Sequence, residues 1–79
     1  MEFKNKIYII QNLIKSKNFS TAIINCKKLL KKYPDNSYTL NLCGLALQGD
    51  KKFSMSLQYF YRALVTEPEN TAIKLSLKN

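Results

Sequence analysis

Apolar residues recur at helical spacing in the first half of the chain. Over residues 3–16 they fall at i, i+4, i+7 and i+11, which places them on one face of a helix. Residues 20–33 show a similar face, with Ser20 as a candidate N-cap and Pro34 as the residue that stops the helix. The pattern therefore predicts two helices, over residues 3–16 and 20–33.

The second half predicts another pair of helices and the beginning of a fifth. Residues 37–48 are apolar on two faces, so a helix there must be covered on both sides. Residues 54–66 are amphipathic, and residues 71–78 begin a further helix. No strand pattern, linker or low-complexity segment interrupts this series. We expect an all-α protein with one domain over residues 1–79.

A sequence repeat relates the two helical pairs. The shift that brings Pro34 onto Pro68 also matches many other positions, and we call this shift the repeat period. A fixed period of this length is typical of helical repeat arrays, in which one unit cannot bury its apolar face alone. The identical pairs are Leu13/Leu47, Lys17/Lys51, Phe19/Phe53, Ser20/Ser54, Leu30/Leu64, Pro34/Pro68 and Asn36/Asn70.

The repeated pattern resembles the tetratricopeptide repeat, a helix–turn–helix unit with the same period. The second unit, residues 37–70, carries most of the likeness, through Gly44, Phe53, Phe60, Ala63 and Pro68. The first unit, residues 3–36, matches at Phe19, Ala22 and Pro34 but has Ile10, Cys26 and Leu29 at three further motif positions. The resemblance implies antiparallel helix–turn–helix repeats of the α-solenoid type, with residues 71–79 as a partial third helix pair. All eight matching residues are expected to serve packing.

The chain is strongly basic, which raises the question of an acidic partner. Lys and Arg number 13 against 5 Asp and Glu, and the formal net charge is +8. Two explanations stand for this excess, a selected basic surface and the codon bias of an A/T-rich genome. Nucleic-acid binding by charge alone is an alternative function, although interleaved aromatics for base stacking are lacking. The clustered cations are Lys27, Lys28, Lys31, Lys32, Lys51 and Lys52.

Catalytic and cofactor chemistry find no support in the composition. Histidine is absent, and the two isolated glycines form no phosphate-binding loop. Cys26 and Cys43 occupy apolar-periodic positions, which favours buried free thiols in a reducing compartment, and two cysteines without histidine make no metal site. No secretory signal or membrane span occurs. We expect a cytoplasmic protein that is not an enzyme and binds no cofactor.

The tetratricopeptide resemblance implies a partner groove lined by the first helix of each unit. Aromatic and aliphatic anchors with a few amides suit a peptide, a helix or a second copy of the chain. The expected groove residues are Ile7, Tyr8, Gln11, Ile14, Tyr38, Asn41, Leu42, Leu45, Gln48 and Leu75.

The sequence thus favours a non-catalytic protein–protein interaction or scaffold module. Two units and a partial third leave apolar strips exposed, which favours a homo-oligomer, most simply a dimer. Besides nucleic-acid binding, one other alternative is the N-terminal repeat segment of a larger enzyme.

Overall fold

The structure of the chain is a computed structural model that describes residues 2–66. Within this range it contains four helices and no strand, so the expected all-α class is confirmed. The expected fifth helix, over residues 71–78, lies outside the described residues. The helices are α1 (Glu2–Lys15), α2 (Phe19–Lys32), α3 (Ser37–Gly49) and α4 (Phe53–Thr66).

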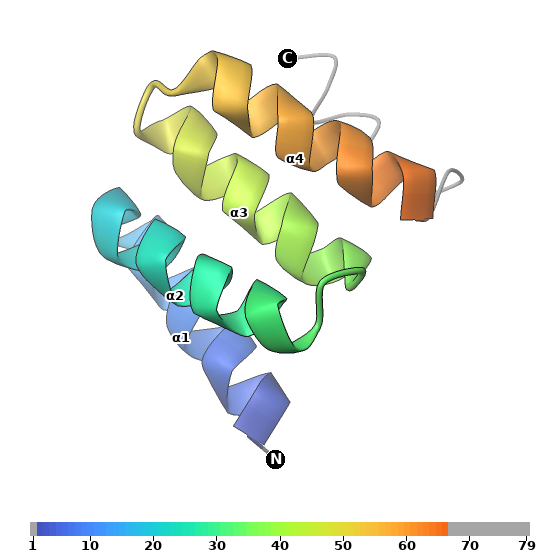
Figure 1. Cartoon of the computed structure of the whole chain (residues 1–79). Coiled ribbons are helices and arrows are strands. Elements are labelled where there is room, and N and C mark those ends of the chain that lie inside the picture. Colours follow the sequence, from blue (N-terminus) through green and yellow to red (C-terminus); the bar gives the residue numbers. More distant parts are fainter. Residues whose placement is uncertain (1, 67–79) are drawn as a thin grey trace.

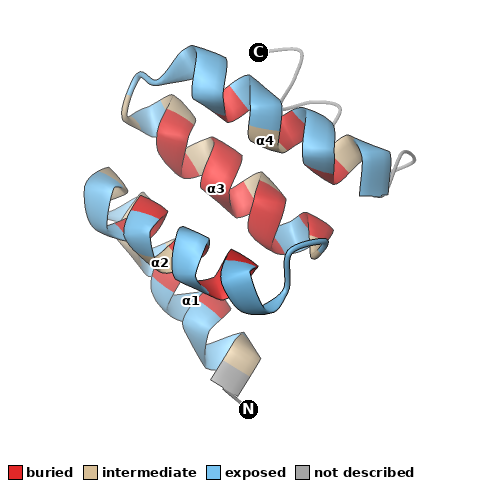
Figure 2. Cartoon of the chain, viewed as in Figure 1, coloured by how far each residue is buried: buried red, intermediate tan, exposed pale blue. Residues whose placement is uncertain are grey.

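Successive helices run antiparallel and pack against one another, and α3 lies at the centre (Figure 1). α3 contacts α2 on one side and α4 on the other, and it also touches α1. Figure 2 shows the consequence, because buried positions cover much of α3, whereas the other helices each keep a broad exposed face. The two apolar faces of residues 37–48 thus both find a covering helix.

The core combines aliphatic side chains with small residues from all four helices. Small residues permit close approach of the backbones, and the aliphatic side chains fill the remaining space between the helices. Its buried apolar residues are Ile7, Ile10, Ala22, Ile23, Cys26, Leu29, Leu30, Leu40, Leu42, Cys43, Ala46, Leu47, Phe60 and Ala63.

The repeat period recurs in the hydrogen bonds of the two inter-helix turns. The Asn18 amide donates to the Leu13 carbonyl at 2.8 Å, and one period later the Lys52 amide donates to the Leu47 carbonyl at 2.9 Å. Each bond joins an amide to the carbonyl at position i−5, which is the wider bond of a Schellman-type helix end. The two turns are therefore equivalent in backbone structure as well as in sequence.

The start of α2 corrects one expectation from the sequence. α2 begins at Phe19 with Asn18 as its N-cap residue, so Ser20 lies inside the helix. The reason is that the turn after α1 is tight, since the Asn18 amide already bonds back to Leu13 and the chain re-enters helical geometry at once. The Asn18 side chain donates to Ser16 Oγ at 2.8 Å and makes no capping bond.

α3 begins with a side-chain cap. Asn36 Oδ1 accepts hydrogen bonds from the Thr39 amide at 2.8 Å and from the Thr39 hydroxyl at 2.9 Å. The first of these bonds satisfies one of the amides that a helix start leaves without an intrahelical acceptor.

Small residues occur where helices approach closely. A Cβ placed on Gly44 would lie 2.5 Å from the Phe60 ring, and one on Gly49 would lie 2.3 Å from the Phe19 ring. Gly44 thus allows α3 to rest on the buried Phe60 of α4, and Ala22 and Ala63 are likewise fully buried. Pro34 lies exposed in the turn after α2, and Pro68 lies outside the described residues.

Phe53 departs from the expected packing role. It is the counterpart of Phe19 in the repeat, yet its side chain is 58% exposed. Phe19 rests on Gly49 of α3, the helix that follows its own pair. α4 is the last helix in residues 2–66, so no described helix lies where α3 lies for Phe19.

Candidate functional site

The residues expected to line a groove lie on α1 and α3, two helices in contact. We call this surface the α1–α3 face. Its most exposed side chains are aromatic: Tyr8 is 65% exposed and Tyr38 is 52% exposed. The half-buried members of the face are Gln11, Ile14, Asn41, Leu45 and Gln48.

Two expected groove residues belong to the core instead. Ile7 and Leu42 are buried among the helices and are not available to a partner in this conformation. Both belong to the cluster of buried apolar side chains that joins the helices, so their side chains serve the core. Leu75 lies outside the described residues.

A hydrogen bond joins the two helices across the α1–α3 face. The side-chain amide of Gln11 donates to the hydroxyl of Tyr38, which belongs to the first turn of α3. This bond fixes the position of the Tyr38 hydroxyl, while about half of the Tyr38 side chain remains exposed. Aromatic side chains held in place in this way lose little conformational entropy on binding, which suits them as anchors.

Asn41 adds an unsatisfied polar atom to the same face. Its Oδ1 is buried and has no hydrogen-bond donor within reach. A buried acceptor without a donor costs about 1–3 kcal/mol relative to a satisfied one. A donor supplied by a partner after a small side-chain rearrangement would recover part of that cost.

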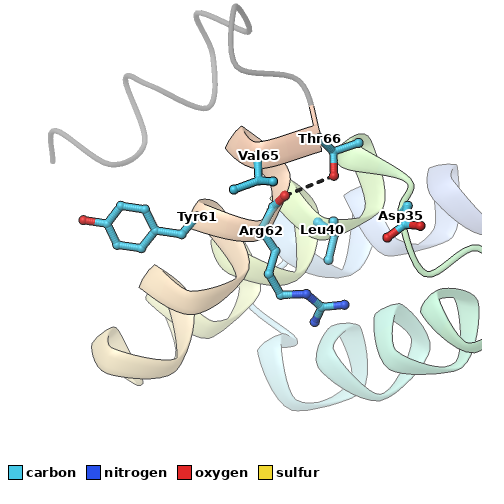
Figure 3. Close-up of a pocket in the computed structure, with 6 residues that line it drawn as sticks. All are labelled: Asp35, Leu40, Tyr61, Arg62, Val65 and Thr66. Atoms are coloured by element: carbon cyan, nitrogen blue, oxygen red, sulfur yellow. Dashed lines mark hydrogen bonds between the residues drawn. The ribbon is translucent and has the colours of Figure 1, made fainter.

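A hollow that the sequence did not indicate lies between the C-terminal half of α4 and the turn after α2 (Figure 3). Its volume is about 300 Å³, and Leu40 of α3 lies between Asp35 on the turn and Arg62 on α4. The Arg62 guanidinium also lies 5.2 Å from the centre of the Tyr59 ring, a cation–π distance. The lining residues come from three separate segments, and no local motif marks them. They are Asp35, Leu40, Tyr61, Arg62, Val65 and Thr66.

The two cysteines meet in the core between α2 and α3. Cys26 and Cys43 are both fully buried and form no disulfide. The hydrogen bond between the two thiols, together with burial, raises the pKa of Cys26 far above its usual range. The same hydrogen bond lowers the pKa of Cys43 against the opposing effect of burial. Burial also raises the pKa of the nearby Tyr59 hydroxyl.

The expected basic residues divide into two groups. Lys27, Lys28, Lys31 and Lys32 are exposed along α2, and Lys51 and Lys52 lie at the turn between α3 and α4. Lys52 also contacts the carboxylate of Asp50 at 3.5 Å. An exposed pair of this kind contributes little to stability.

The part of the chain that the structure describes offers neither a metal-binding cluster nor a membrane-spanning helix. Residues 2–66 contain no group of three or more His, Cys, Asp or Glu side chains that could hold a metal ion. None of the four helices is long and apolar enough to cross a membrane.

Comparisons with known proteins do not extend these observations. No protein-family model, no curated protein and no solved structure matches the chain.

Proposed function

We propose that this chain is a non-catalytic, tetratricopeptide-like interaction module that binds a peptide or helix on the α1–α3 face. The proposal rests on one observation above all, the exposure of Tyr8 and Tyr38 on adjoining helices with Gln11 bonded to Tyr38. A surface that offers oriented aromatic rings and side-chain amides fits the helix-in-groove mode of recognition.

The repeat organisation supports the same proposal. The two inter-helix turns have equivalent hydrogen bonds at equivalent positions of the repeat, which agrees with a pair of helix–turn–helix units in register. Stacked units of this kind present extended surfaces for contact, not enclosed catalytic pockets. The buried free thiols fit a reducing compartment such as the cytoplasm.

Site-directed photo-crosslinking in the source cell tests this function. A benzophenone amino acid replaces Tyr38 in one variant and Tyr61, an equally exposed tyrosine of α4, in a second variant. We expect protein adducts at position 38 and few or none at position 61. Equal adducts at both positions, or none at position 38, would contradict the proposal.

A second copy of the chain is one possible occupant of the α1–α3 face. Sedimentation equilibrium at micromolar concentration separates this case from an external partner. If the second copy is the occupant, Tyr38→Ala converts a dimer into a monomer and Tyr61→Ala does not. A monomeric wild-type protein assigns the face to another protein.

A further inference from the structure

A second surface, on the opposite side of α1 from Tyr8, has a different chemistry. Here α1 and α2 enclose a hollow of about 160 Å³. Its two deepest residues, Ile10 and Leu29, are almost fully buried and form an apolar floor. The rim carries two lysines, one from each helix, and an amide. The lining residues are Lys6, Ile9, Ile10, Asn25, Lys28 and Leu29.

One exposed isoleucine lines this hollow, and another directly precedes the lining residue Asn25 on α2. Ile9 belongs to its lining and is 50% exposed, and Ile24, one turn before Lys28 on α2, is 56% exposed. Large β-branched side chains exposed this far beside a hollow are available to a partner's apolar surface. The hollow therefore combines an apolar floor with two lysines at its rim.

The charge on the α2 side of the hollow has one sign. α2 contains four lysines and no carboxylate, and three of these lysines continue along the helix on either side of Lys28. A surface of one sign favours partners of the opposite sign, both in steering the encounter and in fixing the register of the complex. A second copy of the chain would place lysines against lysines, which argues against self-pairing here.

The size of the hollow favours a macromolecular partner over a small-molecule ligand. Small-molecule sites usually enclose about 300–1,000 Å³, so this hollow is too small for one. It has the scale of a single apolar side chain that anchors a larger partner. Its lining contains neither an aromatic ring nor an arginine, which are the groups that stack on or read nucleic-acid bases. Nor does one enclosed hollow suit a bilayer surface, which needs a broad apolar face.

We infer that the hollow between α1 and α2 is a docking site for an acidic amphipathic helix. One apolar side chain of that helix enters between Ile9 and Leu29, and a flanking carboxylate faces Lys28. This site lies apart from the α1–α3 face, so it does not depend on the function proposed above.

Fluorescence anisotropy with designed peptides tests the inference. The probe is a fluorescein-labelled helical peptide of about four turns, with one central leucine and glutamates one turn before and after it. Its matched partner carries serine in place of that leucine. We expect the leucine peptide to bind at about 50 mM salt at least tenfold more tightly than the serine peptide, and its affinity to fall several-fold at about 200 mM salt, because the flanking ion pairs are exposed.

Variants of the protein locate the binding. Lys28→Glu and Ile9→Ser should each weaken the leucine peptide at least tenfold. Lys4→Glu provides the matched control, because it changes the net charge of the chain as Lys28→Glu does but lies on a different face of α1. Circular dichroism verifies that each variant is folded. We expect Lys4→Glu to bind the peptide as wild type does.

Each other outcome overturns the inference. Equal binding of the leucine and serine peptides would show attraction by charge without any use of the hollow. An equal loss of peptide affinity in Lys28→Glu and Lys4→Glu would also show attraction by net charge alone. Absence of binding by either peptide would exclude an acidic helix. If the protein instead binds phosphatidylserine vesicles or a labelled oligonucleotide, and only Lys28→Glu abolishes that binding, the face would be assigned to a membrane or to a nucleic acid.

Discussion

Lys17 and Lys51 adopt the same left-handed backbone conformation, with φ angles of 65° and 63°. They are equivalent in the repeat, and each directly precedes the residue whose amide closes its inter-helix turn. A left-handed conformation crowds the Cβ atom of any L-residue, and glycine is the residue that adopts it without this cost. Both turns therefore carry the same local strain at the same position of the repeat.

Replacing either lysine with glycine should stabilise the protein. We expect Lys17→Gly and Lys51→Gly each to raise the free energy of unfolding by about 0.5–1 kcal/mol, because relief of the Cβ crowding exceeds the extra chain entropy of glycine. Urea denaturation measures the change. Lys17→Ala and Lys51→Ala serve as controls, since they remove the charge but keep the Cβ. Glycine variants no more stable than the alanine variants would show that the turns are unstrained.

Gly44 and Phe60 should behave as a coupled pair. A methyl group on Gly44 would overlap the Phe60 ring, so Gly44→Ala should lower the free energy of unfolding by about 1–3 kcal/mol. Because the overlap is with the ring, Phe60→Leu should cost less in the Gly44→Ala background than alone. A double-mutant cycle in urea measures this coupling. Strict additivity of the two changes would refute it.

In the first unit, the large and the small side chain at these two repeat positions are exchanged between the helices. Ile10 and Cys26 occupy the repeat positions of Gly44 and Phe60, and both are buried. A large residue on the first helix and a small one on the second thus replace the small residue and the ring of the second unit. Each unit thus combines one large and one small buried residue at these two positions, and each forms a helix pair.

Asn36 and Asn18 offer a matched test of helix capping. Both precede a helix, but only the Asn36 side chain accepts a hydrogen bond from a backbone amide of that helix. Asn36→Ala should therefore cost about 1 kcal/mol of unfolding free energy, and Asn18→Ala clearly less. Thermal and urea denaturation of the two variants give the comparison. Equal losses would mean that the side-chain cap contributes nothing specific.

The thiols of Cys26 and Cys43 should resist modification in the folded protein. Both are fully buried, so neither sulfur is exposed to a reagent, and this holds for Cys43, whose pKa is lowered, as well as for Cys26, whose pKa is raised. We expect Ellman's reagent to react with neither thiol in the native protein at mildly alkaline pH and with both in concentrated urea. A Ser54→Cys variant, at an exposed position of α4, supplies the positive control. Native labelling of Cys26 or Cys43 at the rate of that control would show that the α2–α3 seam opens readily.

The periodicity of the sequence determined the helices and their repeat. Apolar spacing and the Pro34 stop placed four helices within a residue or two of their observed ends, because helix formation depends on local pattern and termination on local chemistry. The two apolar faces of residues 37–48 also required the central position that α3 occupies, since both faces must be covered. Whether the α1–α3 face binds a partner stays a prediction.

Tertiary packing decided what local pattern could not. Phe19 and Phe53 are identical and equivalent in the repeat, yet one rests on Gly49 while the other is exposed, because their surroundings come from different helices. Ile7 and Leu42 were expected in the groove but are buried in the core, whose residues come from helices far apart in the sequence. The hollow between α1 and α2 arises from residues as far apart as Lys6 and Leu29. Burial and cavities depend on contacts between distant segments, whereas helical periodicity is a property of neighbours along the chain.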